Sequence, residues 1–223
     1  MKFLLLPPAL FAASLLSLSA LHAQETDPEP RTLFGSEHDR KNGGWGGPSV
    51  ALTEIMGTQT LLVGLQAGWL IDHRFTLGLA GYGLVTDVPN KGYDAYLLDS
   101  GRKLNKGSQF RMGYGGLLLE PIIAYRSPVH VSLPIIIGAG GCGYETFGPL
   151  PDDFDPEEYD YRNDGQAFFV VEPGVALEFN LVRMVRLGLG ASYRYTTDVD
   201  LPGTPADILH GLNTAFTIKV GRF

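Results

Sequence analysis

Cysteine and charged residues are both scarce in this chain of 223 residues. The single cysteine, Cys142, excludes an internal disulfide framework. Charged residues make up 18% of the chain, and a net charge of −7 without a basic cluster argues against nucleic acid binding. After residue 23, glycines and polar residues such as Glu120 interrupt every apolar stretch before it could cross a membrane as a helix. Stability must therefore come from strand pairing and packing.

The N-terminus has the pattern of a secretory signal peptide. Lys2 supplies a positive start, residues 4–21 form an apolar segment, and Ala23 precedes a suitable cleavage point before Gln24. An uncleaved membrane helix is the alternative, but no stop-transfer flank follows. The polar, aperiodic segment after the signal indicates a flexible periplasmic leader, with a small plug as its alternative role. The predicted divisions are a signal peptide over 1–23, a leader over 24–43 and a barrel domain over 44–223.

Eight runs of alternating apolar residues follow, each of roughly ten residues, the length of a tilted membrane-spanning strand. The predicted strands cover 45–55, 59–71, 75–87, 112–125, 129–144, 166–180, 184–197 and 210–222. Tight turns at Asp72-His73, Ser127-Pro128 and Val182-Arg183 alternate with long polar connections around 90–109, 149–165 and 198–208. Short turns at one end and long loops at the other predict an all-β fold without helices: an eight-stranded antiparallel up-and-down transmembrane barrel with a polar, packed lumen.

Side chains of opposite character occupy the two faces of these strands. In the run 59–71, one face carries the apolar residues Val63, Leu65, Ala67, Trp69 and Ile71, opposite Gly64, Gln66 and Gly68. An aliphatic face toward lipid and a polar face toward the lumen suit a membrane barrel. A soluble exported barrel of lipocalin type, with the faces reversed, is the alternative. Five aromatic residues near the short-turn end form a predicted interfacial girdle: Trp69, Phe75, Tyr125, Phe179 and Phe223.

The last residues, 217–223, resemble the closing strand of bacterial outer-membrane barrels, and the mature chain resembles the small eight-stranded members of that class. The segments 43–48, 69–73 and 81–84 are similar to motifs of uncharacterised barrels of this type. The resemblance implies the outer membrane of a Gram-negative bacterium, contacts with outer-membrane lipid and lipopolysaccharide, and recognition of Phe223 by the barrel-insertion machinery. Phe223 has the opposite parity to Val220, which predicts either a bulge near Gly221 or a terminal residue outside the strand ladder.

The inward face carries the ionisable side chains. By parity, Gln66 and Asn213 face the lumen together with the six members of a predicted charge network: Glu120, Glu172, Glu178, Arg186, Arg194 and Lys219. Buried charges must pair, so we expect a structural network, with Glu178 directly opposite Arg186. A proton or ion relay through a narrow channel is the rival interpretation.

No catalytic, cofactor or metal site is predicted. His130 and Ser132 share a face, and His210 lies near the loop end, but neither histidine has a recognisable nucleophile and acid beside it. A lipid hydrolase or acyltransferase remains the enzymatic alternative. The acidic segment after residue 150 offers only weak calcium ligands, which are Asp152, Asp153, Asp155 and Glu157. We interpret Cys142 as a packing residue.

The sequence thus favours a non-enzymatic outer-membrane barrel with a structural or surface-interaction role. Its longer loops would face outward, because recognition is usually placed on loops held by a rigid scaffold. The oligomeric state and the partner of the loops stay open.

Overall fold

The computed structural model describes residues 42–102, 104, 106–147 and 165–223. The predicted signal peptide, the leader up to residue 41 and the weak metal candidates Asp152, Asp153, Asp155 and Glu157 lie outside the described residues. Residues 40–223 belong to one compact unit, to which the following description applies. Among the described residues, no helix is long and apolar enough to cross a membrane.

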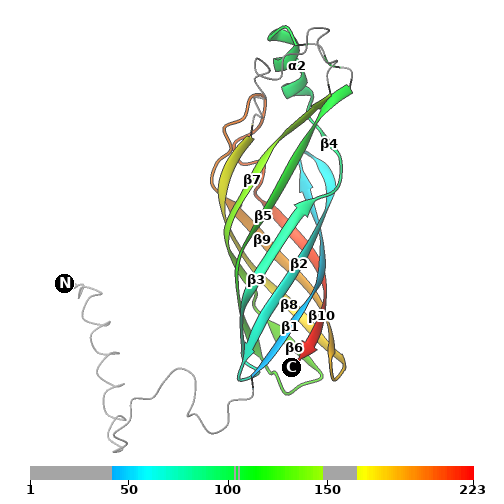
Figure 1. Ribbon diagram of the computed structural model, residues 1–223, viewed down its shortest axis with the longest axis vertical. Helices are drawn as coiled ribbons and strands as arrows, with labels where there is room; N and C mark the ends of the chain where they lie inside the picture. Colours follow the sequence, from blue (N-terminus) through cyan, green and yellow to red (C-terminus); the bar gives the residue numbers. More distant parts are fainter. Residues whose placement is uncertain (1–41, 103, 105, 148–164) are drawn as a thin grey trace, which may run out of the picture. The chain divides into compact units, whose positions relative to one another are not determined.

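The described residues form a closed antiparallel barrel (Figure 1). Its elements are β1 (Gly43–Ile55), β2 (Thr58–Ile71), β3 (Phe75–Leu84), β4 (Val88–Pro89), α2 (Lys91–Asp99), β5 (Lys106–Ile123), β6 (Val129–Ser132), β7 (Ile135–Phe147), β8 (Gly165–Val182), β9 (Val185–Thr196) and β10 (Gly211–Arg222). Strands β6 and β7 both pair with β5 and β8, so together they occupy one position in the wall. Pairing of β1 with β10 and of β3 with β5 closes the ring. The predicted eight-stranded, all-β barrel is therefore confirmed.

The two ends of the barrel differ in their connections. At the short-turn end, brief turns join β2 to β3, β5 to β6 and β8 to β9, and β10 also ends there (Figure 1). At the loop end, β4 and α2 lie between β3 and β5, and residues 197–210 join β9 to β10. The β1–β2 hairpin at the loop end is tight, since Met56 and Gly57 both adopt positive φ. The predicted asymmetry of turns and loops is thus present among the described residues, apart from this one short connection. The predicted connection around 149–165 lies almost wholly outside them.

The prediction of no helix was wrong, because α2 lies within the polar connection after β3. Asn90 is its N-cap, and the Asn90 side chain accepts hydrogen bonds from the backbone N–H groups of Gly92 and Tyr93. Only Tyr93 and Leu97, one helical turn apart, are buried. Two apolar residues give too weak a period to be seen in the sequence. β5 also begins six residues earlier than the predicted residue 112, at Lys106.

The strand predicted over 129–144 is interrupted at residues 133–134. Pro134 has no N–H to donate to a neighbouring strand. The ladder continues around it: Leu133 N–H donates to the Pro121 carbonyl at 2.9 Å, and Gly174 N–H donates to the Pro134 carbonyl at 2.8 Å. The wall therefore remains hydrogen-bonded across the break between β6 and β7.

Apolar side chains cover the outside of the barrel, while the inside holds ionisable side chains together with buried apolar and aromatic ones such as Leu62, Leu70 and Tyr114. Leu65 is 70% exposed and Leu79 63%, whereas Glu178 is 1% exposed and Arg186 6%. This is the distribution expected of a barrel surrounded by lipid. It is opposite to a lipocalin-like arrangement, in which the aliphatic face would be enclosed.

Candidate functional site

The lower half of the lumen holds an ionic cluster around Lys219, which projects inward from β10. Its Nζ donates to both carboxylate oxygens of Glu120 on β5, at 2.6 and 2.7 Å. It also donates to Glu178 Oε1 on β8 at 2.5 Å. The same ammonium lies 4.2 Å from the ring centroid of Trp45 on β1. One lysine therefore connects four strands that are distant in the sequence.

Glu178 is shared among several donors. His130 Nε2 lies 2.9 Å from Glu178 Oε2, and Arg186 Nη1 lies 3.6 Å from the same oxygen. The predicted register was wrong, however, because Glu178 pairs across the ladder with Gly188, and Arg186 pairs with Asn180. The β8–β9 turn is centred one residue later than predicted, and a register irregularity precedes it. Arg186 reaches Glu178 diagonally.

Ser132 and His130 do not form a nucleophile–base pair in this cluster. Ser132 Oγ donates to Glu120 Oε1 at 2.9 Å and to Glu178 Oε1 at 3.2 Å, while His130 contacts the other oxygen of Glu178. A catalytic histidine would lie between the hydroxyl and the carboxylate, whereas here the carboxylate lies between the hydroxyl and the histidine. Both side chains are buried. The arrangement fits a structural role.

A second polar cluster lies nearer the loop end, around Glu172 on β8. Glu172 accepts hydrogen bonds from Tyr114 Oη at 2.6 Å, Ser192 Oγ at 2.6 Å and Asn213 Nδ2 at 2.8 Å. Arg194, which is 0% exposed, donates from Nε to the Leu209 carbonyl at 2.6 Å and from Nη1 to Asn213 Oδ1 at 3.4 Å. Asn213 therefore links the arginine to the carboxylate.

The two clusters are balanced in charge and leave little space. Three acidic side chains (Glu120, Glu172 and Glu178) face three basic ones (Arg186, Arg194 and Lys219), all of them buried. Between the clusters lies a cavity of about 50 Å³, lined on one side by Gly188, Gly190 and Ala176. Such a volume holds about one or two water molecules. Within the described residues, the lumen is thus filled by its own side chains, as an eight-stranded barrel allows.

Asn90 and Tyr144 close the mouth of the barrel beneath α2. Asn90 Nδ2 donates to Tyr144 Oη at 2.5 Å and to the Gly203 carbonyl at 3.0 Å, and Tyr144 Oη lies 2.6 Å from Thr204 Oγ1. The ring of Tyr93 stacks on that of Tyr144 with centroids 3.8 Å apart. The β3–β5 and β9–β10 connections are therefore joined across the mouth. We call this set, Asn90, Tyr93, Tyr144, Gly203 and Thr204, the mouth cap.

We predict that Asn90→Ala destabilises α2 by about 1 kcal/mol through loss of the N-cap. Amide hydrogens within α2 should then exchange about fivefold faster, which hydrogen–deuterium exchange of the refolded barrel would measure. Asn90→Asp is the matched control, since its side chain still accepts from Gly92 and Tyr93 but cannot donate to Tyr144 or Gly203. Unchanged exchange in Asn90→Ala would contradict the capping role.

The contacts of His210 and Cys142 fit a structural role. His210 Nε2 lies 2.8 Å from the Thr196 carbonyl, and its ring meets the edge of Tyr195. Cys142 is buried on the lumen face. Among the described residues, no group of three or more histidine, cysteine, aspartate or glutamate side chains could hold a metal ion.

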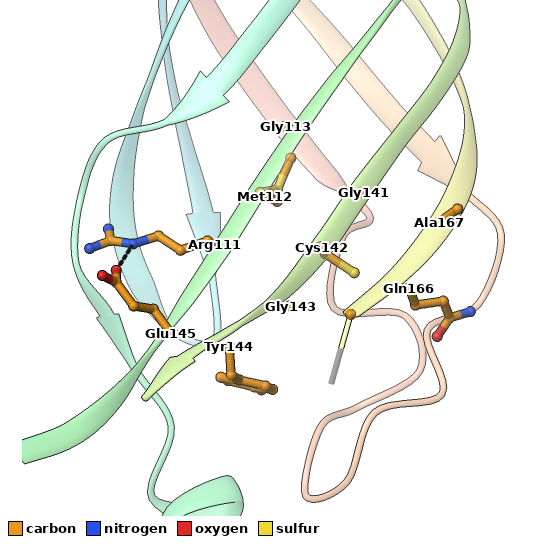
Figure 2. A pocket seen from close by; sticks show the side chains of 11 residues that line it. Arg111, Met112, Gly113, Gly141, Cys142, Gly143, Tyr144, Glu145, Gln166 and Ala167 are labelled. Carbon is orange, nitrogen blue, oxygen red and sulfur yellow. Dashed lines mark hydrogen bonds and ion pairs between the residues drawn. The ribbon is translucent and has the colours of Figure 1, made fainter. Parts of the chain in front are cut away.

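A hollow of about 660 Å³ lies at the upper part of the wall, where β5, β7 and β8 meet (Figure 2). On the outer face, Gly113 pairs with Gly141, which pairs with Ala167, so this row carries almost no side chain. Figure 2 shows Arg111 and Glu145 turned away from Cys142 and Tyr144. Arg111 binds Glu145 and Asp87, each at 3.0 Å. The charges beside the hollow are therefore already paired.

The five predicted girdle aromatics lie at the short-turn end but do not share one environment. Trp69 is 54% exposed on the outer face, and Phe75 and Phe179 are half-buried there. Tyr125 lies in the β5–β6 turn. The pairing of β1 with β10 is regular through Arg222, so Phe223 lies outside the ladder and no bulge occurs at Gly221. The Phe223 ring packs 3.9 Å from the buried guanidinium of Arg186, not in the outer band.

Comparisons with solved structures identify the fold. No protein-family model and no curated protein matches the chain. Neisserial surface protein A, NspA, is similar in structure with a TM-score of 0.53 and 11% identity, covering 82% of this chain and 99% of that one. The attachment invasion locus protein Ail of Yersinia pestis gives a TM-score of 0.44 and 10% identity, covering 81% and 95%. The ring of eight strands and the similarity to NspA together show that this chain has the fold of the small eight-stranded outer-membrane β-barrels.

Proposed function

We propose that this protein is a non-enzymatic barrel of the outer membrane of a Gram-negative bacterium and that its loop end contacts partners outside the cell. The signal peptide pattern and the lipid-suited outer face support this location. Outer-membrane lipid and lipopolysaccharide would surround the wall, and the barrel-insertion machinery would place it there. The short-turn end would then face the periplasm.

The filled lumen is the observation that carries the proposed role. Charges inside are paired or hydrogen-bonded, and the mouth cap joins two connections above them. A small solute therefore has little room to pass, and among the described residues of the loop end the outer surface of the mouth cap and α2 is accessible to a partner. There α2 exposes Tyr96 and Leu98, at 44% and 58%. Exposed apolar side chains on an ordered helix suit a protein partner.

The proposed interaction can be tested on intact cells that display the barrel. We expect binding to at least one member of a panel of immobilised extracellular proteins, and a loss of about tenfold or more in Tyr96→Ser/Leu98→Ser. Lys91→Ser, on the same helix, is the control for surface display. Equal binding by displaying and non-displaying cells would contradict the proposal.

The two rival functions, an ion channel and a lipid-modifying enzyme, each have a direct assay. A steady ion conductance of the refolded protein in a planar bilayer would contradict the filled lumen. Turnover of lipid A or phospholipid by the purified barrel, abolished in His210→Ala, would contradict the non-enzymatic role. We expect neither, because the lumen charges are paired and His210 contacts a backbone carbonyl.

A further inference from the structure

The two ends of the barrel carry opposite charge. Among the described residues, the charged side chains of the short-turn end outside the lumen are four exposed arginines, Arg74, Arg126, Arg183 and Arg222, and the half-buried Asp72, whose carboxylate lies 4.0 Å from Arg74 Nε. Among the described residues of the loop end, eight carboxylates outnumber four cations. The carboxylates are Glu54, Asp87, Asp94, Asp99, Glu145, Asp198, Asp200 and Asp207, and the cations are Lys91, Arg102, Lys106 and Arg111. We call the four arginines the arginine rim. A polyanion or an anionic surface would be attracted to this end alone.

Two arginines of the rim are held against one tyrosine. The guanidinium carbons of Arg74 and Arg126 lie 5.2 and 5.5 Å from the ring centroid of Tyr125. Arg126 Nε also donates to Tyr125 Oη at 3.1 Å. Hydrogen bonding from Arg74, and then from Arg126, lowers the pKa of Tyr125. The ring of His73 stacks parallel to Tyr125, with an interplanar angle of 7°. The two cations are therefore gathered on one aromatic platform, although both remain exposed.

The turns that hold this platform adopt backbone conformations that most residues avoid. Asp72 and His73, in the three-residue connection between the paired Ile71 and Phe75, have positive φ of 51° and 55°, and the Arg74 N–H closes a turn on the Ile71 carbonyl at 3.1 Å. Ala124, directly before Tyr125, has φ of 57° although it is not glycine. A left-handed conformation costs a residue with a Cβ about 1–2 kcal/mol. Such strain is typical of functional sites, which the surrounding structure holds in place.

The platform lies at the depth of lipid headgroups. Trp69 and Phe75 are on the same hairpin as Arg74 and belong to the outer face. Further along β3, Leu77 and Leu79 are exposed in the aliphatic band. Tryptophan and neighbouring aromatics prefer the boundary between acyl chains and headgroups. Arg74 and Arg126, at the turns, therefore lie beyond that boundary, where phosphates are found.

We propose that the arginine rim binds the phosphate groups of anionic phospholipids in the leaflet at the short-turn end, with Arg74 and Arg126 as its central pair. A guanidinium presents paired N–H donors that match phosphate oxygens. The acidic loop end has the opposite preference, so only one leaflet is selected. The proposal depends on the barrel spanning a membrane and is independent of any partner of the loops.

Trp69 provides a local reporter for this binding. The refolded full-length protein is reconstituted in vesicles of phosphatidylcholine with about one fifth phosphatidylglycerol. In each sample only one of the two lipids carries brominated acyl chains. Bromine quenches Trp69, which faces lipid, whereas Trp45, the other tryptophan, is buried in the lumen. We expect phosphatidylglycerol to be enriched about fivefold at Trp69, on the basis of about 1 kcal/mol per cation. About 0.5 M salt should reduce this enrichment.

Paired variants decide the outcome. Arg74→Gln/Arg126→Gln should lower the enrichment to about one, whereas Lys91→Gln/Arg102→Gln, at the loop end, should retain it. Equal quenching by both lipids in the unaltered protein would overturn the proposal. So would enrichment that persists in Arg74→Gln/Arg126→Gln. If that variant does not fold, the salt series on the unaltered protein decides, since enrichment unaffected by salt would exclude phosphate binding by the rim.

Discussion

Replacing Lys219 with methionine is expected to lower the free energy of unfolding by about 3–5 kcal/mol, the cost of leaving buried charges without a partner. Lys219 donates to both Glu120 and Glu178, and all three side chains are buried. Methionine has a similar length but no charge, so the two carboxylates would face each other across the lumen. Urea unfolding in vesicles, followed by tryptophan fluorescence, measures the effect.

A double variant separates charge from packing. Lys219→Met/Glu120→Gln removes one positive and one negative charge from the cluster. Glu178 still has His130 and Arg186 beside it. We expect this variant to be more stable than Lys219→Met alone, because less uncompensated charge is buried. A loss below about 1 kcal/mol in Lys219→Met would show that water or another group already stabilises the two carboxylates without the lysine.

The second large effect is expected on the outer wall. Leu65→Arg should destabilise the barrel by about 2–4 kcal/mol in a bilayer, the cost measured for arginine on the lipid face near the midplane. Leu65 is 70% exposed, so the substitution removes little internal packing. Urea unfolding in vesicles again gives the measurement.

Leu98→Arg is the matched control for this prediction. Leu98 is 58% exposed on α2, beyond the barrel strands, and its replacement should change stability by less than about 0.5 kcal/mol. If Leu65→Arg were equally harmless, the aliphatic face would be in contact with water and the membrane location would be wrong.

The alternating pattern of the strands predicted which side chains face inward. A period of two assigns a face to every residue of a strand, and an error of one or two residues at an end does not change it. Glu120, Glu178 and Lys219 were placed in the lumen on this basis, and all three are buried. Most strand boundaries followed from the same pattern; the largest differences are the start of β5, where polar residues mask the alternation, the break between β6 and β7 at Pro134, and the ends of β3 and β7, each three residues from the predicted end.

The partners within the lumen could not be read from the sequence. Lys219 and Glu120 are 99 residues apart, and their contact depends on the stagger of all strands around the barrel. Glu178 was expected opposite Arg186 because the β8–β9 turn was placed one residue too early. The mouth cap was missed for a related reason: Asn90 is a recognisable N-cap, but its bonds to Tyr144 and Gly203 join connections distant in the chain.

The position of Lys219 on β10 has a consequence for assembly. β10 is the last strand in the sequence, and it joins β1 to complete the ring. Until it docks, Glu120 on β5 and Glu178 on β8 lack their shared counter-ion, and Glu178 has His130, Arg186 and the uncharged Ser132 beside it. Closure of the ring is therefore also the step at which the interior becomes electrically neutral. An intermediate of seven strands would carry excess negative charge, which makes the final pairing cooperative with the formation of the ion cluster.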